Sequence, residues 1–328
     1  MRFRACYTCA VGLFFMLGGS VHGQGQESEQ RLSPADPIRV GVYRVDVGVT
    51  VTDALGHFMK GLHRGDFRVF DDGAEQPVTE FIPIEDPAQL VFMVECGPAA
   101  YFRGDSQLHA AETLLNSISP NDRVAVVGYS QTPQLILDFT TDKRRAQSAL
   151  HDLTSTGTFG ALNLSSSLIK TLDWLASTPG KKTIVLLSTG IDTSSGVDWQ
   201  AIQERLGSSD VRILAVSVSD DLRKVPKSRK LSADKRDDRS YMKEMIAGSD
   251  KNLFEISSIT GGRAYFPRNG REFDHAYAEI AQLVSHEYTL AFVPPALDGR
   301  LHSIEVKVKH SWGRVDHREV YLAPLSSH

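Results

Sequence analysis

The chain has 328 residues, of which 41% are hydrophobic and 23% charged, and its formal net charge is −4 at pH 7. A chain of this length buries enough apolar surface for one ordinary domain plus a smaller one. The slightly acidic balance argues against a general nucleic-acid binder.

Residues 1–23 have the pattern of an export signal. Arg2 and Arg4 precede a short apolar run, and residues 21–23 supply a cleavage-site pattern. The run is shorter than the roughly 20 helical residues that span a bilayer, and no later stretch is long enough. We therefore expect a periplasmic or secreted protein with no transmembrane segment after cleavage. An uncleaved N-terminal anchor is the alternative.

Cleavage would also determine which cysteines remain in the mature protein. It removes Cys6 and Cys9 and leaves Cys96 alone, so we expect no intramolecular disulfide. Cys96 is then expected to act as a small buried hydrophobe. Residues 24–38, rich in Gln, Glu, Ser and Pro, predict a disordered leader.

A small β segment is predicted over residues 39–86. Residues 39–51 largely alternate between apolar and polar positions, which is typical of a strand. Residues 67–73 (Phe-Arg-Val-Phe-Asp-Asp-Gly) predict a strand that ends in a tight turn, and residues 77–84 form a further extended stretch.

Residues 87–286 alternate between short apolar runs and amphipathic stretches, which predicts an α/β domain with a doubly wound, mostly parallel sheet. Strands are expected at 90–94, 123–129, 134–138, 183–188, 211–217 and 263–266. Helices are expected at 107–118, 143–153, 162–176, 198–206, 252–260 and 273–285. The strands at 123–129 and 134–138 are joined by only four residues, too few for a crossover, so one antiparallel edge strand is predicted.

Residues 287–324 return to the β pattern, with strands expected at 287–293, 302–309 and 316–322, before a tail at 325–328. We expect these strands to pair with the N-terminal ones and form one β module around the inserted domain. The scattered histidines, His302 among them, are expected at the surface.

The order of elements, the 67–73 pattern and the strand at 121–127 (Asn-Asp-Arg-Val-Ala-Val-Val) resemble exported bacterial proteins related to the von Willebrand factor A (VWA) domain. The likeness covers residues 39–324. It implies that the loop after the 90–94 strand corresponds to the family's Asp-x-Ser-x-Ser, half of a metal-ion-dependent adhesion site. Here the loop begins with Glu95, and both serines are replaced, by Gly97 and Ala99.

The other two loops of the implied metal site also depart from the family pattern. Gly160 stands where a threonine is expected, with Thr158 close enough to leave the alignment open. Thr189 stands where the second aspartate is expected, and Asp192 follows three residues later. The resemblance therefore implies a non-enzymatic interaction or scaffold module that binds largely without metal and uses no cofactor.

A basic loop is predicted at residues 221–245, where the segment from Arg223 to Lys243, both included, has nine Lys and Arg residues. It is either a solvated insertion or a contact for an acidic partner. Tyr241 is its only aromatic residue, which disfavours nucleic-acid binding. Because the carboxyl ends of parallel strands share one edge, this loop should lie near Glu95. The binding-face candidates are Glu95, Gly97, Ala99, Tyr101, Thr158, Gly160, Thr189, Asp192, Arg229, Lys230 and Arg236.

Two other functions remain open. A weak Mg²⁺- or Ca²⁺-dependent adhesin would use Glu95 and Thr189 as ligands, although one carboxylate seldom holds Mg²⁺ well. A less favoured α/β hydrolase would use Ser130, whose Gly-Tyr-Ser-Gln-Thr setting resembles a nucleophile elbow but lacks the final glycine and precedes a predicted strand. The partner is expected to be an unidentified protein or an acidic envelope component.

Overall fold

The computed structural model describes residues 44–97, 105–155, 161–194, 199–219, 233–309, 313–323 and 325. All of these belong to one compact unit, Val42–His328. The predicted export signal and leader lie outside the described residues. Within the described part of the chain, no helix is both long and apolar enough to cross a membrane.

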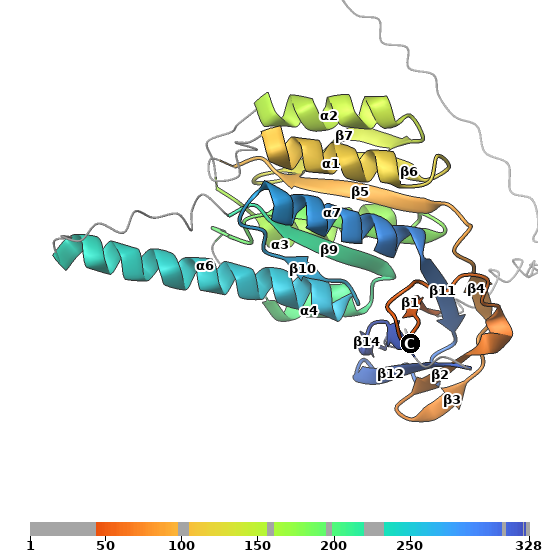
Figure 1. Ribbon diagram of the computed structural model, residues 1–328. Coiled ribbons are helices and arrows are strands. Elements are labelled where there is room, and N and C mark those ends of the chain that lie inside the picture. The colour runs from red at the N-terminus through yellow and green to blue at the C-terminus, as the bar shows by residue number, and fades with distance from the viewer. Residues whose placement is uncertain are drawn as a thin grey trace, which may run out of the picture. The chain divides into compact units, whose positions relative to one another are not determined.

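The larger sheet has six strands in the order β10-β9-β8-β5-β6-β7 (Figure 1). All neighbouring pairs are parallel except β6 and β7, so the predicted antiparallel edge strand is confirmed. Every residue of β5, β8 and β9 is buried, as expected for strands covered on both faces. The strands are β5 Ala88–Glu95, β6 Arg123–Tyr129, β7 Pro133–Thr140, β8 Lys181–Ser188, β9 Val211–Ser217 and β10 Ala264–Tyr265.

Helices cover both faces of this sheet. Side chains alternate along β5, so Leu90, Phe92 and Val94 pack with helices α1, α2 and α7, while Val91 and Met93 pack with α3, α4 and α6. The helices are α1 Asp105–Ser117, α2 Lys143–Ser155, α3 Leu164–Leu175, α4 Trp199–Gly207, α6 Ala233–Ile259 and α7 Gly270–Ser285. The fold is therefore the predicted α/β class.

Helix α6 corrects the prediction of a basic loop at 221–245 from residue 233 onward, and residues 221–232 lie outside the described part of the chain. The helix was expected to begin at residue 252, but it begins at Ala233, and Figure 1 shows it as one long rod. The sequence hides this start because residues 233–245 carry charges on every side and no apolar stripe, although most are good helix formers. An apolar face begins only near Leu253 and Ile256, which are buried against the sheet.

The N- and C-terminal segments together build a second β region, as predicted. One sheet has the order β13-β1-β11-β4 and the other the order β14-β12-β2-β3. Their shared core includes Val47, Val49, Tyr288, Leu290 and Phe292. The elements are β1 Val45–Thr52, 3-10 helix η1 Arg64–Asp66, β2 Phe67–Asp71, β3 Ala74–Gln76, β4 Glu80–Ile82, β11 Glu287–Phe292, β12 Leu301–Val308, β13 Arg314–Asp316 and β14 Val320–Leu322.

The single strand expected at residues 316–322 is two short strands in different sheets. β13 pairs with β1, and β14 pairs with β12, so residues 317–319 cross from one sheet to the other. Arg318 lies in this crossing, where its buried guanidinium donates to the carbonyls of Gly207 and Ser209 (2.7 Å for Ser209) at the end of α4. Burial lowers the pKa of Arg318 to about 10. These contacts tie the crossing between the two strands to the end of α4.

A buried ion pair links the β region to the α/β sheet. Arg212 of β9 pairs with Glu287 of β11, and both side chains are only 6% exposed. Arg212 also donates to the Gly261 carbonyl (2.9 Å) and to the Thr50 hydroxyl (3.1 Å). A Cβ atom at Gly48 would lie 2.9 Å from the Glu287 carboxyl carbon, so the absence of a side chain there makes room for the pair.

Candidate binding site at the carboxyl edge of the sheet

Glu95 is the last residue of β5, and its side chain is enclosed by the ends of two neighbouring strands. The residue is only 2% exposed. Its carboxyl group accepts hydrogen bonds from the Ser188 hydroxyl (2.9 Å) and from the Thr189 amide (2.8 Å). The Thr189 hydroxyl lies 2.9 and 3.0 Å from its two oxygens, and the Tyr129 hydroxyl lies 3.2 Å away. The sequence correctly predicted that Glu95 and Thr189 meet at this edge.

The hydroxyl groups around Glu95 all make hydrogen-bond contacts inside the protein. The Tyr129 hydroxyl also lies 2.7 Å from the Ser188 hydroxyl oxygen, which accepts from the Gly190 amide at 2.8 Å. Burial raises the pKa of Glu95 above its ordinary value, against the opposing effect of its hydrogen-bond donors. Burial also holds the pKa of Tyr129 well above its ordinary value, so the phenol stays neutral. We call Glu95, Tyr129, Ser188 and Thr189 the Glu95 cluster.

Gly97 and Leu162 fill the space next to the Glu95 cluster. A Cβ atom at Gly97 would lie 2.7 Å from a methyl carbon of Leu162, which is itself buried. Even the small side chain of a serine would therefore force Leu162 to move. A side chain at position 97 would therefore compete with Leu162 for the same space.

Asp192 does not join the Glu95 cluster, and instead fixes the third loop to helix α3. One of its oxygens accepts from the amide (2.9 Å) and hydroxyl (2.6 Å) of Ser165, and the other accepts from the amide (2.9 Å) and hydroxyl (2.5 Å) of Ser194. Burial opposes ionisation of Asp192, but these hydrogen bonds outweigh it and lower its pKa. The carboxylate therefore has a structural role at the start of α3.

Cys96 is partly buried and packs against the core on the α1, α2 and α7 side, in line with the predicted hydrophobic role. Burial raises the pKa of its thiol. A pocket of about 210 Å³ lies beside it, between the β6–β7 turn and α2, and includes Ser130, Thr132, Ile136 and Asp152. Sequence reasoning missed this pocket because its lining comes from a turn, an edge strand and a helix that share no motif.

Ser130 is not at a nucleophile elbow. The residues after it turn into strand β7 rather than into the helix that such an elbow requires. Its carbonyl accepts from the Asn163 amide at 2.8 Å, which ties this turn to the cap of α3. The geometry is that of a hairpin turn.

Several predicted site residues cannot be placed. Arg236 lies in α6, of which only the backbone is described at that point. The following predicted residues lie outside the described part of the chain: Ala99, Tyr101, Thr158, Gly160, Arg229 and Lys230.

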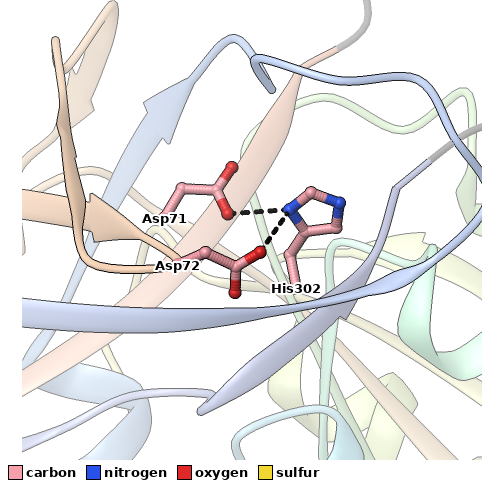
Figure 2. A group of neighbouring side chains, drawn as sticks. All are labelled: Asp71, Asp72 and His302. Atoms are coloured by element: carbon pink, nitrogen blue, oxygen red, sulfur yellow. Dashed lines mark hydrogen bonds and ion pairs between the residues drawn. The ribbon is translucent and has the colours of Figure 1, made fainter.

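His302 corrects the expectation that the histidines lie at the surface, because it is only 8% exposed. Its Nδ1 atom lies 3.0 Å from Asp71 and 3.1 Å from Asp72 (Figure 2). Its Nε2 atom lies 3.2 Å from Asp298. Burial lowers the pKa of His302, but the surrounding carboxylates outweigh this effect and raise it overall. The alternation in β12 could have revealed the burial, since His302 is in phase with the buried Ile304.

Strand order, the antiparallel edge strand and a polar cluster at the strand ends define an α/β protein with a candidate binding edge. Residues 99–191 match the von Willebrand factor type A domain family. Over this segment the chain is related to VWA domains, which are in general non-enzymatic interaction modules.

Solved structures give distant likenesses that concern the fold alone. An aerotolerance-related membrane protein from Bacteroides fragilis is 13% identical, with a TM-score of 0.43 over 61% of this chain and 98% of that chain. BatB from Bacteroides thetaiotaomicron is 12% identical, with a TM-score of 0.44 and the same coverage. A von Willebrand factor type A protein from Catenulispora acidiphila is 10% identical, with a TM-score of 0.43 over 79% of this chain and 73% of that chain. Curated proteins give no significant match.

Proposed function

We propose that this protein is an exported, non-enzymatic interaction module of VWA type, which binds its partner at the carboxyl edge of the sheet largely without metal. The observation that carries the proposal is the state of Glu95. Its carboxyl group is buried and receives donors from Ser188, Thr189 and Tyr129.

The physical argument concerns what a cation would have to displace. Mg²⁺ requires near-octahedral oxygen coordination and gives up its waters reluctantly. At this edge the ion would have to break the internal hydrogen bonds of Glu95. In return it would gain only one carboxylate ligand. The position of the family's first serine is held by Gly97, against which Leu162 packs. A weak adhesin that uses Glu95 and Thr189 therefore remains the second candidate.

The proposed binding face surrounds the Glu95 cluster. Gln131 and Thr132 are exposed in the turn after β6, and Thr193 is exposed in the third loop. The pocket beside Cys96 opens in the same region. We propose that the basic residues Arg229, Lys230 and Arg236 add attraction for an acidic protein or envelope component. Export rests on the pattern of residues 1–23.

Thermal unfolding in EDTA and in millimolar Mg²⁺ or Ca²⁺ tests metal independence. After bound metal has been removed by dialysis, we expect the same midpoint in all three conditions, for the wild type and for Glu95→Gln. A cation at about 100 times its dissociation constant would add ~2.7 kcal/mol to stability. A Mg²⁺ or Ca²⁺ shift that Glu95→Gln abolishes would replace this proposal with the adhesin.

Capture of envelope proteins by the immobilised protein tests the binding face. Thr132→Arg places a bulky cation on the proposed face, and Asn121→Arg places the same side chain at the opposite, amino end of β6, where it is also exposed. We expect Thr132→Arg to reduce capture and Asn121→Arg to leave it unchanged, equally in EDTA and in Mg²⁺. Equal loss with both variants, or capture only in Mg²⁺, would contradict the proposal.

A further inference from the structure

A second polar cluster lies in the β region and shares no residue with the Glu95 cluster. Asp71 ends β2, Asp72 opens the turn to β3, and His302 lies near the start of β12 (Figure 2). One carboxylate oxygen from each aspartate and Nδ1 of His302 lie within 4.8 Å of one another. We call these three residues the Asp71 cluster.

The spacing of the three atoms is close to that of ligands around a small metal ion. Zinc binds histidine nitrogen and carboxylate oxygen at about 2.0–2.2 Å, so neighbouring tetrahedral ligands lie about 3.3 Å apart. Nδ1 of His302 lies 3.0 Å from Asp71 and 3.1 Å from Asp72. Nδ1 of His302 would have to move away from each aspartate by only a few tenths of an ångström to reach that spacing, and the ligand atoms all lie within 4.8 Å of one another.

Each member of the Asp71 cluster is held by a further contact on its outer side. The Tyr321 hydroxyl donates to Asp71 Oδ2 at 2.7 Å. The amide and hydroxyl of Ser303 donate to Asp72 Oδ1 at 2.8 and 2.9 Å.

The histidine ring is anchored in the same way. Nε2 of His302 contacts Asp298 at 3.2 Å, which leaves Nδ1 facing the two aspartates. Metal-binding histidines commonly give their other ring nitrogen to a carboxylate in this way, and metal-binding carboxylates are themselves hydrogen-bonded. The outer contacts therefore fix the three inner atoms in the orientation that ligands need.

We propose that Asp71, Asp72 and His302 form a zinc site in the β region. Two carboxylates balance the charge of the ion, and one imidazole suits zinc better than Mg²⁺ or Ca²⁺, which prefer oxygen alone. Binding displaces the proton from Nδ1 of His302 to solvent. The Asp72 side chain is 57% exposed, so the ion has a route from solvent and space for water as the fourth ligand. The ion would join the β2–β3 turn to β12.

The decisive variant is Asp72→Asn in the full chain. Asp72 has a φ of 46°, a conformation that asparagine tolerates, and an asparagine oxygen can still accept from Ser303. The substitution thus removes one charged ligand and keeps the turn. The matched control is Asp53→Asn, which alters an exposed aspartate of the same region whose side chain contacts His57 at 3.3 Å.

The experiment measures thermal unfolding after EDTA treatment and zinc addition, with equilibrium dialysis to count bound zinc. We expect one zinc per chain and a midpoint about 5 °C or more higher for the wild type, Asp53→Asn and Glu95→Gln. Asp72→Asn should lose affinity by about 100-fold or more, because losing an outer contact alone costs 10–100-fold. His302→Gln should abolish binding.

Three results would overturn the zinc site: no zinc-induced shift in the wild type, a shift that persists in Asp72→Asn, or an equal loss in Asp53→Asn. Should His302→Gln fail to fold, Asp72→Asn still decides the matter, since Asp72 is exposed. A shift abolished by Glu95→Gln would instead place the metal at the carboxyl edge. The proposal of a zinc site and the proposal of a metal-independent binding face can therefore be refuted independently of each other.

Discussion

Truncation of Glu95 tests whether its carboxyl group serves the fold. In Glu95→Ala, the Ser188 hydroxyl and the Thr189 amide and hydroxyl lose their acceptor inside the protein. Each buried donor left unsatisfied costs ~1–3 kcal/mol, and partial re-pairing among the hydroxyls reduces the sum. We expect a loss of ~3 kcal/mol, which lowers the melting midpoint by roughly 6–12 °C in a domain of this size.

Glu95→Gln should cost much less. The Ser188 hydroxyl and the Thr189 amide both donate to the same carboxylate oxygen, Oε2, so the amide oxygen of glutamine can take that place. The amide nitrogen then faces the Thr189 hydroxyl, 3.0 Å from the other oxygen, and can donate to it. We expect the free energy of unfolding to stay within ~1 kcal/mol of the wild type.

The pH dependence separates the two variants further. Burial raises the folded-state pKa of Glu95 above its ordinary value of 4.5. A carboxyl group with a raised folded pKa contributes stability that is complete below the unfolded pKa and is lost as pH rises through the folded pKa. The wild type should therefore lose stability relative to Glu95→Gln as pH rises from about 4.5 through the raised value.

Urea denaturation at several pH values between 4 and 8, with circular dichroism to verify folding, measures all three proteins. The reasoning is refuted if Glu95→Ala stays within ~1 kcal/mol of the wild type, because the internal hydrogen bonds would then contribute little. It is also refuted if Glu95→Gln is as harmful as Glu95→Ala, since the negative charge itself would then be required.

Three further predictions concern the rest of the molecule. Arg212→Met alone or Glu287→Leu alone should lower the free energy of unfolding by ~3–5 kcal/mol, and the double variant should lower it by less than either. A double-mutant cycle in urea measures these losses, and additive losses would count against the buried pair. Asp192→Ala should lower the free energy of unfolding by ~1–2 kcal/mol near neutral pH. This difference from the wild type should disappear as pH falls below 3.8 through the lowered folded-state pKa of Asp192. A difference that does not depend on pH would show that the charge of Asp192 is irrelevant. Gly261→Ala should lower the melting midpoint, because its φ is +71° and a Cβ would lie 2.6 Å from the Arg318 amide nitrogen; an unchanged midpoint would contradict this.

The α/β sheet could be predicted because its strands are short, unbroken apolar runs bounded by turns. The meeting of Glu95 with Thr189 followed from the same pattern, since parallel strands β5 and β8 end at one edge. What the pattern could not supply was the partner of each polar atom. Asp192 contacts Ser165, a residue of α3, and only the three-dimensional structure shows it.

Prediction from the sequence is weakest where no apolar periodicity exists. The first half of α6 is charged on all sides, so its helix was mistaken for a loop. His302 was assigned to the surface on residue type, although its phase with Ile304 in β12 places it inside. Arg318 likewise interrupts what looked like one strand. Its partners Gly207 and Ser209 are distant in sequence, so the strand pattern gives no sign of them.

The pairing of the two chain ends sets the order in which this protein can fold. Val47 of β1 lies opposite Leu290 of β11, so the N-terminal strand cannot pair until nearly the whole chain is available. Such long-range pairing slows folding, since the loop must close before the contact forms. Until then the edge of β1 stays open to other strands and to chaperones. The last strand of the α/β sheet ends at Tyr265, so this sheet can form before the C-terminal strands are available. It then offers a preformed surface on which the terminal strands assemble.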